Sequence, residues 1–333
     1  MPVPVTTSRP QVKKALLVGV SYQTNDELQM QGMDKLPGSL EDVRRLRKLL
    51  NVKFKYPIEN IVMMTDDEVS TGDDLWPTKE NVLRKMKELV QDVQYGDSIC
   101  FAFSGHGGQV ATDDPQEEDG FDEVLLPLDA TYDPDNKEQY GAYIRDNDVR
   151  DILVNNLPPG VRCTMIFDCC HSGTASDLSN VEVPMSPLSP LVSPPIQSSG
   201  AFARMQTVHD EHAPSAYSWP SSRVPGSRRN SLSIENYVTS WSACRDEQLT
   251  FGSNKGGIFI RAFYNALIHT TSLPTHSQLL KKLRHELQNA VNRINDHHKG
   301  VHTACSGDDL MVAPRPQLGA LSPQAILDIS FSL

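Results

Sequence analysis

Short apolar runs alternate with amphipathic segments through the first half of the chain. Four of these runs are continuous and strand-like, as is typical of buried strands, and they are Lys14–Val20, Asn60–Thr65, Asp97–Phe103 and Arg162–Phe167. Between them, apolar residues recur at helical spacing in 40–50 and 82–93, and Thr78 is the expected N-cap of the second helix. Strands that alternate with helices predict an α/β fold, with a mostly parallel central sheet flanked by helices on both faces.

The pattern is then interrupted by a stretch without apolar periodicity. Residues 181–230 contain eight Pro, ten Ser and two Gly, a composition typical of a linker. Before it, 123–128 is predicted to be extended and 146–157 helical; after it come a strand at 236–241, helices over 258–267 and 279–294, and a final strand near 310–312. We therefore divide the chain into a short N-terminus (1–12), a large segment (13–180), a linker (181–235), a small segment of the same domain (236–314) and a C-terminal tail (315–333).

Composition narrows the function classes. The formal net charge of −11 argues against sequence-independent binding of nucleic acid, which requires a basic surface. No apolar run approaches the ~20 residues of a membrane span, and the N-terminal residues do not resemble a secretory signal. The six cysteines do not form a disulfide-rich pattern, and the vicinal pair Cys169-Cys170 favours a reducing compartment. We expect a cytoplasmic protein, with the nucleus as a second compartment.

Two unusual motifs follow predicted strands. One is Ser104-Gly-His-Gly-Gly108 and the other is Asp168-Cys-Cys-His-Ser-Gly173. In a parallel sheet the carboxyl ends of the strands line one crevice, where His106 and Cys170 could meet as base and nucleophile. Strand alternation directs the Asp168 and Cys170 side chains to the same side. The motifs can also be interpreted structurally, as a turn-capping Asp168 beside two inert cysteines and an exposed turn histidine.

The two motifs resemble those of the metacaspases, caspase-like cysteine peptidases of fungi, plants and protists. The resemblance implies that Cys170 attacks the scissile carbonyl, that His106 protonates the leaving amine, and that the amides of Gly107 and Cys170 form the oxyanion hole. It also implies a monomer with a caspase-like fold, acting on protein and peptide substrates.

The same resemblance implies cleavage after Arg or Lys. The acidic specificity pocket would then be formed by Asp42 and Asp168, with Ser39 and Ser104 beside them. The family usually has Cys at the position of Ser39, which cannot act as a thiol. On sequence alone, Asp42 can also be interpreted as an acidic residue favoured by the helix dipole.

Carboxylates are concentrated in 113–123, with seven in eleven residues. They do not match the EF-hand loop, and such runs are usually solvated. Many metacaspases require calcium, and the resemblance places its ligands at Asp122, Asp146, Asn147 and Asp177. A zinc site at His106, Cys169, Cys170 and His171 is the alternative, although the chain has no CxxC pair.

The linker contains four arginines in Ser/Pro-rich surroundings, namely Arg204, Arg223, Arg228 and Arg229. An Arg/Lys-directed peptidase could cleave itself at these positions, so we predict self-cleavage into a large and a small segment. Two other classes of function stay open: a non-proteolytic scaffold or protein quality-control factor on the same fold, and a nucleotide-binding α/β protein. Neither GxGxxG nor a GK[ST] motif follows a strand, which disfavours the nucleotide-binding protein.

Overall fold

A computed structural model describes most of the regular structure of the chain. It covers residues 9–67, 73–113, 120–133, 135, 139–169, 178, 180–181, 236–243, 252–253, 256–301 and 312–333. No helix among these residues is long and apolar enough to cross a membrane.

A six-stranded sheet forms the centre of the molecule, with strand order β13-β10-β9-β3-β1-β2. Neighbouring strands are parallel except for the last pair, β10 and β13, which is antiparallel. The strands are β1 (Lys13–Gly19), β2 (Ile61–Thr65), β3 (Ser98–Ser104), β9 (Arg162–Asp168), β10 (Tyr237–Ser242) and β13 (Gln317–Ala320). The five strand-like runs of the sequence up to residue 241 are therefore confirmed, with bounds shifted by about one residue.

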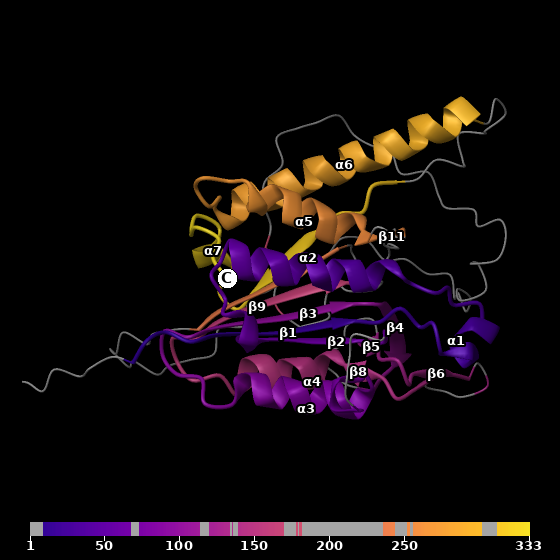
Figure 1. The fold of residues 1–333 in the computed structure, drawn as a ribbon, viewed down its shortest axis with the longest axis horizontal. Helices are drawn as coiled ribbons and strands as arrows, with labels where there is room; N and C mark the ends of the chain where they lie inside the picture. The colour runs from indigo at the N-terminus through magenta and orange to yellow at the C-terminus, as the bar shows by residue number, and fades with distance from the viewer. Residues whose placement is uncertain are drawn as a thin grey trace, which may run out of the picture.

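Helices cover both faces of this sheet (Figure 1). On one face lie α2 (Gly38–Val52) and α5 (Ile258–Ile268), with α6 (His276–Val301) outside them, and on the other lie α3 (Lys79–Val90) and α4 (Asp146–Arg150). The sheet residues alternate between the two cores: Leu16 and Val18 belong to one, and Ala15 and Leu17 to the other. The predicted three-layer α/β architecture is confirmed, because each apolar strand is buried on both sides.

One of the predicted helices begins as expected, and another differs in detail. The N-cap of α3 is Thr78, as expected, and its hydroxyl accepts a hydrogen bond from the Asn81 amide. The helix predicted over 146–157 is α4 followed by the π-helical turn η3 (Asp151–Asn155). The 3₁₀ turns η1 (Ile58–Asn60) and η2 (Asp73–Leu75) and the short helices α1 (Asp26–Met30) and α7 (Pro323–Ile326) complete the helical elements described.

A small antiparallel sheet lies beyond the end of β3. It consists of β4 (His106–Ala111), β5 (Phe121–Leu126) and β8 (Ile144–Arg145), in the order β4-β5-β8. The predicted extended segment 123–128 is thus a strand, though it begins and ends two residues earlier. Two separate two-stranded sheets are also present. One pairs β6 (Thr131–Tyr132) with β7 (Tyr140–Gly141), and the other pairs β11 (Gly252–Ser253) with β12 (Gly256–Gly257).

The prediction for the C-terminal part was wrong in two respects. Of the strand predicted near 310–312, residues 310 and 311 lie outside the described residues, and Val312 is outside any strand and 63% exposed. The final strand described is β13, which pairs with β10. Residues 315–333 are not a tail, because the Phe331 ring is buried against Trp241 and Phe263. Gln317–Ala320 has one large apolar residue, so its strand character depends on pairing with β10 rather than on an apolar run. The small segment of the domain therefore extends beyond 314.

Candidate active site

Three strand ends meet in register at one edge of the sheet. Gly19, the last residue of β1, pairs with Ser104 of β3, which in turn pairs with Asp168 of β9. Because β2 and β3 lie on opposite sides of β1, the connections leave this edge in opposite directions, and such switch points are the usual ligand sites of open α/β sheets. Figure 1 shows this edge beside β4 and β11.

The start of α2 lies directly against the end of β1. A Cβ atom on Gly19 would lie 2.7 Å from the carbonyl oxygen of Ser39 and 2.9 Å from a methyl carbon of Val43. Only glycine allows this approach, which brings Ser39 and Asp42 to the strand ends. Both side chains are buried, and Asp42 lies past the first turn of the helix. Its position is therefore explained by its contacts in the interior rather than by the helix dipole.

Asp42 and Asp168 face each other at this edge. The hydroxyl of Ser104 donates to Asp42 Oδ2 over 3.0 Å, and the amide of Gly257 donates to both Asp42 oxygens over 2.9 and 3.0 Å. The amide of Ile260 lies 3.4 Å from Asp168 Oδ2. Strand β12 and the start of α5 thus cover a carboxylate pair that is 1% and 5% exposed. The structure brings Asp42, Ser104 and Asp168 together, and their role as a specificity pocket stays a prediction.

Both carboxyls have raised pKa values. Burial raises the pKa of Asp42 to about 6. The hydrogen bonds from Gly257 and Ser104 lower it, as does the charge of Arg45, whose Nη1 atom lies 3.8 Å from Asp42 Oδ1. Burial also raises the pKa of Asp168 well above its usual range, and the negative charge of Asp42 adds to the effect. Two buried acids this close are costly to ionise together without a cation between them. A guanidinium or ammonium group is the type of ligand that such a pair can bind.

His106 begins β4, just beyond the same strand ends. Its Nε2 atom lies 2.8 Å from the carbonyl oxygen of Asp34, which can only accept, so Nε2 carries the proton and Nδ1 is the basic nitrogen. Burial lowers the pKa of His106, and the hydrogen bond to the Asp34 carbonyl and the negative charge of Asp34 raise it by less. The imidazole is therefore neutral at neutral pH, as a general base must be.

The end of β9 follows the predicted alternation. Phe167 and Cys169 are buried in the core on the α3 side, whereas Ile166 is buried on the α2 side, where Asp168 meets Asp42. Cys170 lies outside the described residues, as do Asp177 and the linker arginines 204, 223, 228 and 229. The contact between Cys170 and His106 stays a prediction.

The calcium ligands predicted in the large segment lie on neighbouring elements. Asp122 of β5 and Asp146 of α4 are buried, and Arg145, next to Asp146, lies with its Nε atom 3.4 Å from Asp122 Oδ2. The other oxygen of Asp122 is buried, and no donor from the described residues reaches it. Asn147, also at the start of α4, is half-buried. A buried carboxylate oxygen without a donor fits a hard cation such as Ca²⁺, although within the described ranges no three His, Cys, Asp or Glu side chains cluster as a metal site.

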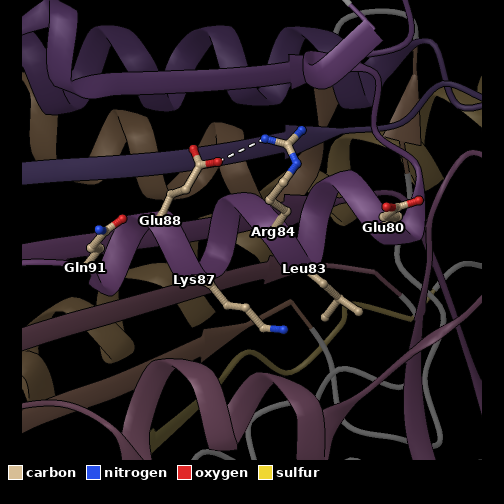
Figure 2. Close-up of a pocket in the computed structure, with 6 residues that line it drawn as sticks. All are labelled: Glu80, Leu83, Arg84, Lys87, Glu88 and Gln91. Carbon is tan, nitrogen blue, oxygen red and sulfur yellow. Dashed lines mark hydrogen bonds and ion pairs between the residues drawn. The ribbon is translucent and has the colours of Figure 1, made fainter.

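An open groove of about 620 Å³ lies elsewhere, along α3 (Figure 2). Arg84 and Glu88 form an ion pair of 2.9 Å on this helix, and Leu83 and Lys87 line the groove beside them. None of the predicted site residues lines it.

Sequence reasoning missed three contributors to the candidate active site: Tyr22, Asp34 and Gly257. Tyr22 and Asp34 lie in connections without a motif, so nothing in their spacing indicates the contact with His106. Gly257 carried a usable signal, because two adjacent glycines directly before an amphipathic helix suggest a close approach to the main chain.

Comparison with known proteins agrees with this geometry. Residues 13–179 match the family model "Metacaspase, peptidase C14 domain". Metacaspase-1A of Aspergillus oryzae is 42% identical and metacaspase-1 of Meyerozyma guilliermondii 40% identical, each over 166 residues, which cover 50% of this chain and 36% of the relative. The match thus spans little more than a third of the length of these relatives.

One solved structure shares the fold at low identity. A Geobacter sulfurreducens protein, GSU0716, superposes with a TM-score of 0.54 at 15% identity, over 97% of this chain and 99% of its own. Caspase-1 of Spodoptera frugiperda gives a TM-score of 0.48 at 8% identity, over 93% and 87%. The family match and the sheet covered by helices confirm the expected caspase-like α/β fold, and the chain belongs to the metacaspase family.

Proposed function

We propose that this protein is a calcium-stimulated cysteine endopeptidase that cleaves after Arg or Lys. The observation that carries the proposal is the buried pair Asp42 and Asp168 at the switch point of the sheet, next to the motif that contains His106. The carboxylate pair supplies a site for a basic side chain, and family membership supplies the peptidase chemistry.

In this mechanism the Cys170 thiol loses its proton to Nδ1 of His106 and its sulfur attacks the carbonyl carbon. The amides of Gly107 and Cys170 stabilise the oxyanion that develops. His106 then gives its proton to the leaving amine, and the resulting thioester is hydrolysed by water. The hydrogen bond from Nε2 to the Asp34 carbonyl supports this role, because it holds the basic nitrogen in one tautomer.

Calcium would be held by Asp122 and Asp146, with Asn147 and Asp177 as further oxygen ligands. Asp122 Oδ1 supports this assignment, because no donor from the described residues reaches it, whereas Arg145 lies beside Oδ2. A cation at Oδ1 would balance the buried carboxylate there. Calcium supplies charge compensation there and takes no part in the peptide chemistry.

Turnover of matched peptides tests the substrate class. Four peptides that differ only at the cleaved position carry Arg, Lys, citrulline or Asp there, and each is assayed with calcium and with a chelator. We expect turnover of the Arg and Lys peptides only, and more with calcium. Citrulline has the shape of arginine without its charge, so equal turnover of the Arg and citrulline peptides would contradict the ionic pocket.

Self-cleavage is tested on the purified chain. With calcium, the wild-type protein should give a large and a small fragment cut after one or more of the four linker arginines, and Cys170→Ala should stay intact. If the wild-type chain stays whole while it turns over the Arg peptide, self-cleavage is wrong and the peptidase assignment stands.

The rival function is a scaffold or quality-control factor that needs no hydrolysis. It predicts that Cys170→Ala retains the cellular function, whereas the peptidase proposal predicts its loss. We favour the peptidase. Burial makes Asp42 and Asp168 costly to ionise, and a scaffold has no need for such a pair of acids.

A further inference from the structure

We propose that Tyr22 is a positioning residue for His106, and that Asp66 holds Tyr22 in place. The inference rests on the proposed peptidase function, in which His106 is the base. It concerns two residues from connections that carry no motif, and neither is expected to touch the substrate.

Tyr22 contacts His106 in two ways. Its hydroxyl accepts a hydrogen bond of 2.8 Å from the His106 amide, and its ring lies 4.7 Å from the imidazole, centroid to centroid, at an angle of 38°. The same hydroxyl donates to the carbonyl oxygen of Leu126. His106 and Leu126 are paired residues of β4 and β5, so the hydroxyl joins the main chains of both strands next to the imidazole of His106.

The fit around the hydroxyl is close. A Cβ atom on Gly105 would lie 2.8 Å from the Tyr22 oxygen, so the chain can pass from β3 to β4 at this point only because residue 105 has no side chain. The tyrosine is 1% exposed. A buried hydroxyl that both donates and accepts fixes the position of its neighbours, because losing either bond leaves a buried polar group unsatisfied.

Asp66 fixes the turn that presents Tyr22. Its two carboxylate oxygens accept from the amide and the hydroxyl of Ser21, over 2.7 and 3.0 Å, and all these groups are buried. Tyr22 itself has φ +57°, a left-handed conformation that is rare for a large side chain. The hydrogen bonds to Ser21 hold the residue before it and so stabilise this strained turn.

The imidazole is thus held from two sides, by Tyr22 and by the Asp34 carbonyl at Nε2. Removing the Tyr22 hydroxyl would leave the His106 amide without this acceptor and free the first residue of β4 to shift. The expected consequence is a less well aligned base, which lowers kcat and leaves substrate binding at Asp42 and Asp168 largely unchanged.

The first test is kinetic and uses Tyr22→Phe with Tyr56→Phe as the matched control. Tyr56 is also fully buried, but its hydroxyl has no hydrogen-bond partner in the described part of the chain, so its loss should cost little. On the Arg peptide we expect Tyr22→Phe to lower kcat by about 10-fold to about 100-fold with KM within about twofold, and Tyr56→Phe to change neither. Equal kinetics in the two variants would overturn the proposal.

The second test needs no peptidase activity and separates this inference from the proposed function. Histidine-labelled Cys170→Ala protein is titrated by NMR with and without Tyr22→Phe. We expect the parent to show the Nε2-protonated tautomer with a slowly exchanging ring proton, and Tyr22→Phe to show faster exchange and a pKa of His106 closer to its ordinary value. Unchanged tautomer, exchange and pKa would refute the positioning role even if the wild-type protein cleaves peptides.

Asp66→Asn provides a second variant, in case Tyr22→Phe does not fold. It keeps the shape of the side chain and weakens the bonds to Ser21, so it should move kcat and the His106 signals in the same direction by a smaller factor. Wild-type values of kcat and of ring-proton exchange in Asp66→Asn would show that Asp66 does not support Tyr22.

Discussion

The carboxylates of Asp42 and Asp168 lie on the same side of the Gly257 main chain. A Cβ atom on Gly257 would overlap Oδ2 of Asp168 and lie 3.2 Å from Oδ2 of Asp42, and the Gly257 amide donates to Asp42. One residue of β12 therefore lies against two acids that come from α2 and β9. The proposed binding of a basic side chain by this metacaspase depends on that arrangement.

Asp42→Asn should raise stability and lower activity. The neutral amide removes a buried charge whose raised pKa corresponds to about 3 kcal/mol at neutral pH, while some hydrogen bonding to Gly257 is retained. We expect a Tm equal to or above that of the wild type, and kcat/KM for the Arg peptide at least about 100-fold lower, as when one partner of a buried ion pair is lost. If the Tm of Asp42→Asn is several degrees lower than that of the wild type, the charge of Asp42 does not destabilise the folded protein.

Binding of a cationic peptide should depend on pH. Protonated Asp42 attracts the cation less, and its pKa of about 6 without ligand means that its contribution to the affinity rises with pH up to about 6 and then levels off. Calorimetry of the Arg peptide with Cys170→Ala protein should show Kd falling between about pH 5 and about pH 7. The citrulline peptide should show no such change, and Asp42→Asn should reduce the slope for the Arg peptide.

The same pKa predicts the pH dependence of stability. The folded pKa lies above the unfolded value of about 3.9, so between those values the folded state binds more protons than the unfolded state. The free energy of unfolding should therefore fall as pH rises through this window, and the decrease should be smaller in Asp42→Asn. Denaturant titrations at a series of pH values measure the difference; identical profiles would show that Asp42 does not titrate in this range.

Gly257→Ala should remove peptidase activity without unfolding the protein. The methyl group would displace the Asp168 carboxylate, and β12 lies at the edge of the site rather than in the main sheet. The control is Gly96→Asn, because none of the residues that the structure describes lies within 4 Å of its added Cβ and asparagine tolerates a positive φ. Near-normal kcat/KM in Gly257→Ala would mean that the acids need not hold this arrangement during turnover.

Calcium binding should depend on Asp122. We expect Asp122→Asn to weaken Ca²⁺ binding in calorimetry by at least about 10-fold, the smallest loss typical for groups that support a metal site. Asp328→Asn, an exposed acid in the small segment, should leave the affinity unchanged. Equal affinity in both variants would place the calcium site elsewhere.

The contribution of the C-terminal segment to the core can be measured directly. Phe331→Ala removes a fully buried ring that packs on Trp241, and such truncations cost about 3–5 kcal/mol of unfolding free energy. Val312→Ala, at an exposed position, should change it by less than about 0.5 kcal/mol. A small effect of Phe331→Ala in urea unfolding would show that 315–333 is not part of the cooperative core.

The sequence by itself determined the elements and the two motifs. Periodicity of apolar residues is local information, so it located the parallel strands, α2, α5 and α6, and it placed His106 and Asp168 near the ends of strands. Strand alternation also predicted correctly that Phe167 and Asp168 face opposite sides, because that alternation is a property of the extended backbone.

Only the tertiary structure decided which distant residues meet. The Gly257 amide is 215 positions from Asp42, and the Tyr22 hydroxyl is 84 positions from the His106 amide. Strand β13 was likewise missed because its partner, β10, lies far away in the sequence. Such contacts depend on how the sheet orders its strands and closes its connections, and no short stretch of sequence carries that information.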